Sequence, residues 1–201
     1  MRKEQKANYP ESARGAAALL VRMVLEDGVY TNIALNQYLR GSRLSDLDRR
    51  LATELVYGTV KASGTLDWYL AQCVSRPLDK VAGDILAILR ISTYQLLYMT
   101  RIPASAAVNE AVKLARSVSH EGSAKFVNGV LRGLLRKQEA GAFVLPDAEK
   151  QDADYLSLKY YHPRWLVKRW LGPWGRGGTE RLLAFDNTAA PVCLRANTLA
   201  V

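Results

Sequence analysis

One side of the segment 124–136 gathers cationic and amide side chains at helical spacing. Drawn as a helix, the segment places four of them within about 80° of one another. We call these four residues the polar stripe: Lys125, Asn128, Arg132 and Arg136. The opposite side is apolar and consists of Phe126, Val127, Val130, Leu131, Leu134 and Leu135. Because cations bind phosphates and an amide can contact base edges, the polar stripe is a candidate nucleic-acid-binding surface.

Two glycines, Gly129 and Gly133, lie beside the polar stripe. Each costs the interior of a helix about 1 kcal/mol relative to alanine. One interpretation is that they let a nucleic-acid backbone approach the helix closely. The alternative is that the cations form a solvated face and that the glycines accommodate a neighbouring helix. The residues alone leave both interpretations open.

Two cations near the N-terminus, Arg14 and Arg22, could extend the polar stripe. This requires the first and last helices of the same bundle to be adjacent, and the sequence does not show that adjacency. We predict RNA binding by the polar stripe together with Arg14.

The residue types used for catalysis and metal binding are sparse and scattered. Cys73 and Cys193 lie far apart, without a CxxC pair or a nearby histidine, so we expect reduced thiols and no metal site. Cys193 falls in an apolar run, where we expect a buried, inert thiol. His162 precedes Pro163, which is typical of a cap or turn residue. The glycines at 172–178 follow a helical pattern and include a proline, so we predict a loop and no cofactor site there. We predict no catalytic residue in this chain.

The composition favours a polyanionic partner. The chain has 201 residues, 49% of them apolar, which suffices for one buried core and a smaller second unit. Its formal net charge is +9, and cations gain affinity by displacing counterions from phosphates. Residues 1–140 hold 20 Lys and Arg against 13 Asp and Glu, whereas residues 141–201 hold eight against six. The excess charge therefore lies in the first part of the chain.

The hydrophobic pattern predicts an all-α bundle in the first part. Helices are expected over 12–26, with Ser12 as the cap, and over 32–39. Another begins at Ser45, is interrupted at Gly58 and Gly64, and resumes over 66–74. The segment 84–99 is apolar on nearly every side, which indicates the central buried helix. Further helices are expected after Pro103 and over 124–139, the last capped by Ser123.

The second part has a different pattern. We assign residues 1–140 to the helical domain, 141–160 to a linker and 161–201 to the truncated start of a second domain. Short helices are expected between 155 and 185, and 192–197 alternates as a strand does. A lone strand cannot hold a sheet, so we expect Val201 not to be the natural end. Neither a membrane span nor a secretory signal is apparent, which predicts a cytoplasmic protein.

Several blocks of sequence, in a fixed order, resemble the NusB-like domain. They are DRR at 48–50, ELVYGTV at 54–60, LD at 66–67, IPASAAVNEAV at 102–112 and KFVNGVLR at 125–132. The resemblance covers residues 12–138. This domain occurs alone as a bacterial transcription antitermination factor, and as the front part of Sun/Fmu-type (RsmB) ribosomal RNA cytosine-C5 methyltransferases.

Two later blocks favour the methyltransferase. YHPRWLV at 161–167 and PVCLRANT at 191–198 resemble the segment that joins the NusB-like domain to the catalytic domain, and a free-standing factor would end near Gln138. The resemblance implies a NusB-like bundle followed by an RRM-like α/β subdomain. It also implies S-adenosylmethionine as cofactor of the parent enzyme, and ribosomal RNA and the chain's own methyltransferase domain as partners. We expect no membrane and no metal. The alternatives are a protein-interaction module that docks on the catalytic domain, or a stand-alone antitermination factor.

Overall fold

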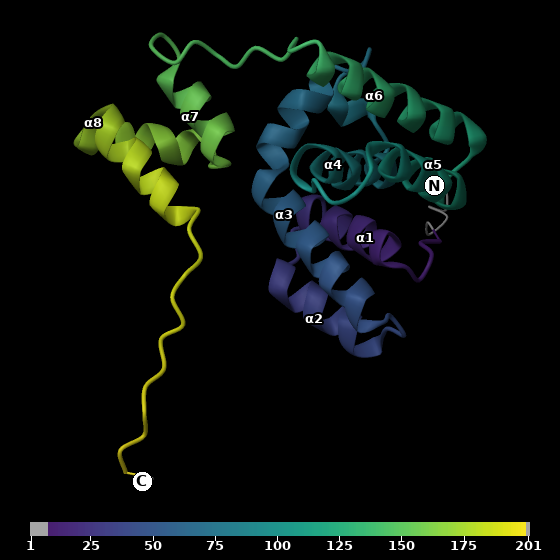
Figure 1. Ribbon diagram of the computed structural model, residues 1–201, viewed down its shortest axis with the longest axis horizontal. Coiled ribbons are helices and arrows are strands. Elements are labelled where there is room, and N and C mark those ends of the chain that lie inside the picture. Colours follow the sequence, from purple (N-terminus) through teal and green to yellow (C-terminus); the bar gives the residue numbers. More distant parts are fainter. Residues whose placement is uncertain (1–7, 200–201) are drawn as a thin grey trace. The chain divides into compact units, whose positions relative to one another are not determined.

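The structure, a computed structural model, describes residues 8–199 and divides the chain into two units (Figure 1). The first unit comprises residues 1–146 and the second residues 147–201. The first unit contains six α-helices and one short 3-10 helix among its described residues: α1 (Ala13–Leu25), α2 (Thr31–Gly41), α3 (Asp46–Ala71), η1 (Leu78–Lys80), α4 (Gly83–Tyr98), α5 (Ala104–Val118) and α6 (Glu121–Glu139).

Helix α4 forms the centre of the first unit, as the sequence predicts. It packs against α1, α3, α5 and α6, which surround it in Figure 1. Nine of its residues are buried, among them Ile88, Leu89 and Ile91. A helix that is apolar on nearly every side can bury its apolar residues only where other helices surround it, which explains the central position of α4.

Helix α3 runs without a break through both glycines that we expected to interrupt it. Gly58 lies directly under the ring of Tyr94 in α4, and a Cβ at this position would collide with that ring. The glycine therefore provides room for close packing of α3 on α4, and the surrounding contacts outweigh its low helix propensity. One turn beyond Gly64, Asp67 accepts two hydrogen bonds of 2.8 Å from Arg90, which also fix α3 to α4.

The helix caps agree with the sequence at two places and differ at a third. Ser12 Oγ accepts a hydrogen bond from Gly15 N, and Ser45 Oγ accepts one from Asp48 N. The cap predicted at Ser123 is wrong, because α6 begins earlier, at Glu121. Its N-cap is His120, whose Nδ1 accepts a hydrogen bond from the backbone N–H of Ser123 at 3.3 Å.

The second unit contains α7 (Asp152–Tyr160) and α8 (Arg164–Asp186). Its small core is formed by Ala153, Leu156, Val167 and Leu183. Residues 152–160 were assigned to the linker, but their apolar side chains pack against α8, so the linker is shorter than predicted. The glycine cluster is largely helical, which corrects the predicted loop. Only Gly175, with φ 59°, departs from helical geometry, and it kinks α8.

The segment after α8 has no strand among the residues that the structure describes. Residues 192–197 therefore do not form the strand that their alternating pattern predicts. A strand needs a hydrogen-bonding partner, and here the apolar side chains of Val192 and Leu194 are exposed instead. Cys193 is exposed as well, so our expectation of a buried thiol is wrong. Between residues 8 and 199, no helix is long and apolar enough to cross a membrane.

Candidate nucleic-acid interface

The polar stripe lies on the outer side of α6. Lys125, Arg132 and Arg136 are exposed and Asn128 is half-buried, whereas the buried residues of the helix face the core. Helix α6 packs against α5 and α4, which leaves its other side open to solvent. The structure therefore brings the four residues together on one accessible surface.

The positive charge of the polar stripe is not neutralised by ion pairs with the described residues. Arg132 Nε donates a 3.0 Å hydrogen bond to Asn128 Oδ1, a neutral acceptor, so its charge is retained. Glu121 lies one turn before Lys125, but Arg116 binds its carboxylate at 2.6 Å. That hydrogen bond from Arg116 lowers the pKa of Glu121, and the field of Lys125 adds to the effect. Lys125 itself is exposed to solvent.

The two glycines beside the polar stripe do not make room for a neighbouring helix. A Cβ at Gly129 would meet nothing within 4 Å among the described residues. At Gly133, a Cβ would contact only the guanidinium of Arg136, at 3.9 Å. Packing within this chain therefore does not require a glycine at either position. The neighbouring helix of the alternative interpretation is not found among the described residues, and close approach by another molecule stays a prediction.

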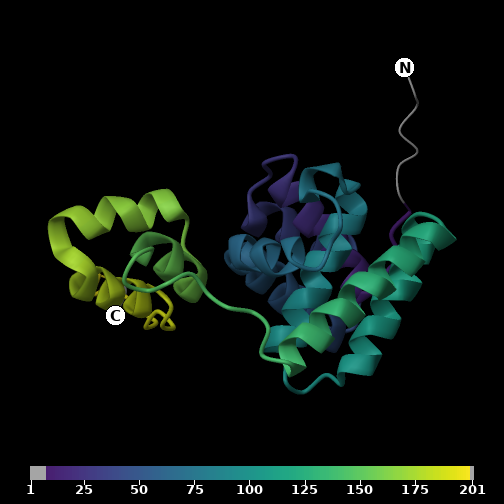
Figure 2. The same cartoon turned by 90° about the horizontal axis from the view of Figure 1, so that it is seen from above.

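A groove runs between α5 and α6 next to the polar stripe, and Figure 2 shows these two helices side by side. Its volume is about 560 Å³. It is lined by Ser105, Val108, Asn109 and Val112 of α5 and by Asn128, Arg132 and Leu135 of α6. Two members of the polar stripe thus form one wall of the groove.

Arg14 lies on α1 and contacts the central helix α4. Its helix packs against α2, α3 and α4, whereas α6 packs against α5, α4 and α3. Arg14 is half-buried, and its Nε donates a 2.9 Å hydrogen bond to the buried side chain of Gln95 in α4. A hydrogen bond from Lys113 lowers the pKa of Glu110 in α5, and the charge of Arg14 contributes. The role of Arg14 in RNA binding stays a prediction.

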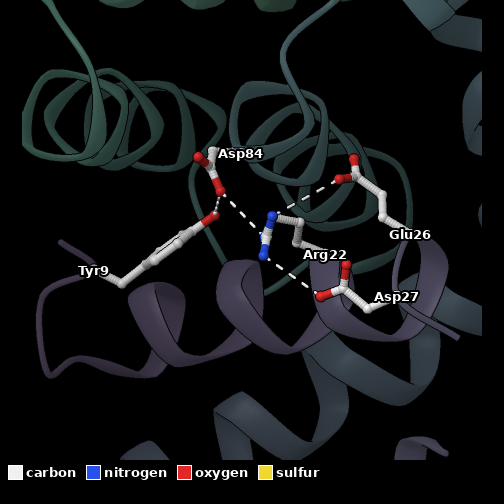
Figure 3. A network of polar contacts seen from close by, with 5 residues as sticks. All are labelled: Tyr9, Arg22, Glu26, Asp27 and Asp84. Atoms are coloured by element: carbon white, nitrogen blue, oxygen red, sulfur yellow. Dashed lines mark hydrogen bonds and ion pairs between the residues drawn. The ribbon is translucent and has the colours of Figure 1, made fainter. Parts of the chain in front are cut away.

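Arg22 belongs to a network of acidic side chains and does not extend the polar stripe (Figure 3). Its guanidinium lies 3.4 Å from a carboxylate oxygen of Asp27 and 3.4 Å from one of Asp84. A third carboxylate, that of Glu26, lies 4.0 Å away. Three acidic neighbours more than offset one positive charge. Our hypothesis that Arg22 joins the candidate RNA surface is wrong.

Tyr9 connects this network to the start of the described chain. Its hydroxyl donates a 2.6 Å hydrogen bond to Asp84 Oδ1, in the first turn of α4 (Figure 3). Burial raises the pKa of Tyr9, and the hydrogen bond to Asp84 raises it further. The segment before α1 is thereby fixed to α4.

The comparison with known proteins assigns the helical part of the chain. Residues 11–136 match the NusB family. The chain belongs to the NusB family. Residues 162–201 match a second family, the ferredoxin-like domain of RsmF/B-like methyltransferases. The resemblance that the sequence blocks indicate is thus confirmed for both parts.

The curated relatives are longer proteins than this chain. A probable ribosomal RNA small subunit methyltransferase B of Synechocystis sp. is 40% identical over 188 residues. A protein of the same name from Bacillus subtilis is 34% identical over 188 residues. In both comparisons the match covers 94% of this chain and 41% of the relative. The chain therefore spans less than half the length of the relatives it matches.

Solved structures show the same bundle. The structure of T. maritima NusB superposes on this chain with a TM-score of 0.58 at 21% identity. The superposition covers 67% of this chain and 98% of the other chain. A structure of NusB and NusE in complex with double-stranded RNA superposes with a TM-score of 0.58 at 20% identity. The superposition covers 63% of this chain and 95% of the other chain. At these identities the likeness concerns the fold alone, and it confirms the predicted NusB-like bundle.

The NusB domain contains groove-lining residues that the sequence did not predict. Ser105 and Asn109 line the groove beside the polar stripe, yet neither carries a charge. A second groove, of about 420 Å³, includes Lys80, His120 and Arg76, whose guanidinium lies 4.6 Å from the ring centre of Phe126. The i, i+4 spacing of Ser105 and Asn109 was the available signal, but it has meaning only once α5 is known to lie beside α6.

His162 and several other titratable residues of the second unit form structural contacts. His162 Nδ1 lies 2.6 Å from the carbonyl oxygen of Tyr160, at the turn between α7 and α8, as expected of a turn residue. Asp154 of α7 binds Arg164 of α8, and Glu180 binds Lys159 at 2.9 Å. Within residues 8–199, no group of three potential metal ligands occurs. These contacts hold α7 on α8.

Proposed function

We propose that this chain is the RNA-binding N-terminal module of an S-adenosylmethionine-dependent ribosomal RNA cytosine-C5 methyltransferase, where it helps to recognise small-subunit ribosomal RNA in the cytoplasm. The observation that carries the proposal is the polar stripe on α6, whose exposed cations keep their charge. Free cations on one face of a helix are suited to phosphate binding, because each contact releases counterions.

The second domain supports the methyltransferase over a stand-alone antitermination factor. Residues 162–201 match a domain named for methyltransferases, and both relatives described above are named as ribosomal RNA small subunit methyltransferases. A NusB domain in such a protein would serve to place the RNA. We therefore propose ribosomal RNA and the methyltransferase domain as the two partners.

The described residues do not fit S-adenosylmethionine. A nucleotide-type cofactor pocket needs a strand, a glycine-rich turn and a helix, and the glycines here lie within the kinked helix α8. We derive no step of methyl transfer from this chain. Its proposed contribution is to bind RNA, while the cofactor and the catalytic groups would belong to the methyltransferase domain.

A second candidate function is docking on the methyltransferase domain. The second unit exposes 64% of Trp165, 53% of Trp174 and 70% of Phe185. Large exposed apolar groups often mark protein-binding surfaces. This function predicts tight binding to the methyltransferase domain that responds little to salt, with no binding to RNA.

The test is the salt dependence of RNA binding by single variants. We expect Arg132→Ala and Lys125→Ala each to weaken binding of small-subunit ribosomal RNA roughly fivefold to tenfold at 0.1 M salt. The slope of log affinity against log salt should fall by about 0.7 to 0.9 per variant. The matched control is Arg50→Ala, an exposed arginine at the start of α3. Unchanged affinity and slope in both variants would show that the polar stripe is not an RNA site.

A further inference from the structure

The groove between α5 and α6 has a regular construction. Ser105, Asn109 and Val112 are spaced i, i+4, i+7 on α5, so they share one face of that helix. The α6 wall repeats the same spacing with Asn128, Arg132 and Leu135. Only a short turn connects the two helices, so they run antiparallel and the two faces line the groove together. With Val108, the α5 wall carries one amide and two valines, whereas the α6 wall carries one amide, one leucine and a cation.

The amides of the groove have unused hydrogen-bonding capacity. Asn128 accepts from Arg132 through Oδ1, which leaves its amide N–H groups for another acceptor. Asn109 is exposed on the opposite wall and has no side-chain partner among the described residues. The groove therefore offers donors from both walls and an acceptor from Asn109.

The remaining lining is apolar. Val108 is 5% exposed, and Val112 and Leu135 are half-buried, so aliphatic side chains lie between the two amides. A nucleobase has matching chemistry, because its faces are apolar and its edge carries hydrogen-bonding groups. The exposed cations Lys125, Arg132 and Arg136 lie along the α6 side, where a sugar-phosphate backbone would pass.

We infer that the groove receives one unpaired nucleotide of the RNA. The base would lie against the aliphatic side chains, with the amides of Asn109 and Asn128 on its edge and the adjacent phosphate near Arg132. A base within a duplex cannot bind in this way, because its edge is paired and its faces are stacked. The inference rests on the proposed RNA-binding function and adds a preference for unpaired nucleotides to it.

The experiment compares two RNAs with equal numbers of phosphates, one a perfect duplex and the other a hairpin with an unpaired loop. The wild-type chain should bind the hairpin more tightly, by about tenfold. Asn109→Ala should remove most of this preference and leave the salt slope unchanged, because asparagine carries no charge. Alanine favours the helix more than asparagine does, so the variant should fold, which circular dichroism would check. Asn36→Ala, at an exposed position of α2, is the matched control.

The outcomes separate this inference from the proposed function. If the wild-type chain binds neither RNA, the proposed function fails and the inference fails with it. If it binds both RNAs equally, with the expected salt slope, only the inference is overturned. The inference is also overturned if Asn109→Ala retains the full preference for the hairpin, in which case the groove would be left for another occupant such as a protein helix.

Discussion

Helices α1 and α6 both carry arginines on amphipathic helices of one bundle, but their charges serve different ends. On α1, Arg14 binds the buried Gln95, and Arg22 is surrounded by three carboxylates. On α6, Arg132 and Arg136 are exposed, and neither has an acidic partner among the described residues. Charge on a helix therefore predicts a polyanion-binding surface only where the fold supplies no internal partner.

The largest expected difference between the two helices concerns stability. Arg22→Ala should lower the free energy of unfolding by about 1–2 kcal/mol, because it leaves Asp84 and its acidic neighbours without their cation. The partial exposure of the network keeps the loss near the lower end of that range. Denaturant unfolding would measure it. Arg132→Ala should change stability by less than about 0.5 kcal/mol. If Arg22→Ala weakens RNA binding as strongly as Arg132→Ala does, the distinction between the helices fails.

The glycines allow a sharper test of the α6 surface. Gly129→Ala should raise the free energy of unfolding by up to about 1 kcal/mol, because a Cβ there meets open space and alanine favours the helix. It should nevertheless weaken RNA binding if the RNA backbone approaches the helix at that point. Gly64→Ala is the matched control, since its Cβ also meets open space, in α3. Gly64→Ala should raise the free energy of unfolding by a similar amount and leave RNA affinity unchanged. Equal RNA affinities in the two variants would argue against close approach at Gly129.

The smallest effect is the contribution of the α1 network to the pH dependence of stability. Burial and the hydrogen bond to Asp84 raise the pKa of Tyr9 in the folded state above its ordinary value of 10.0. The protonated Tyr9 hydroxyl therefore stabilises the fold fully below about pH 10. This stabilisation is lost as the pH rises from there through the pKa of Tyr9 in the folded state. Tyr9→Phe should lower stability at neutral pH by less than about 1 kcal/mol and make its alkaline decline shallower. Unfolding measured between pH 8 and about 11 would test this, with Arg132→Ala retaining the wild-type decline.

Much of the bundle follows from local sequence. The apolar run of 84–99 predicts a buried helix because such a pattern has no solvent-facing side, and α4 is that helix. The polar and apolar sides of α6 follow from helical periodicity in the same way. The errors arise where a contact outside the segment decides the local structure. Gly58 lies inside α3 because Tyr94 packs on it, and no pattern within 46–71 reveals that.

The candidate site was predictable only where it depends on local helical spacing. Residue types and spacing place the members of the polar stripe on one face, but they do not show which cations are neutralised elsewhere. Arg14 and Gln95 are 81 positions apart, and Arg22 and Asp84 meet only in the folded bundle. The groove likewise needs faces from two helices, so Asn109 acquires significance only once α5 lies beside α6.

The most direct test of the central claim is the salt dependence of RNA binding by a triple variant, Lys125→Ala with Arg132→Ala and Arg136→Ala. Affinity for small-subunit ribosomal RNA would be measured over a series of salt concentrations for wild type, the triple variant and Arg22→Ala. We predict that the triple variant loses about 100-fold or more in affinity at 0.1 M salt. Its slope of log affinity against log salt should fall by about 2 to 3, whereas Arg22→Ala should keep the wild-type slope. A triple variant with the wild-type affinity and slope would contradict the account.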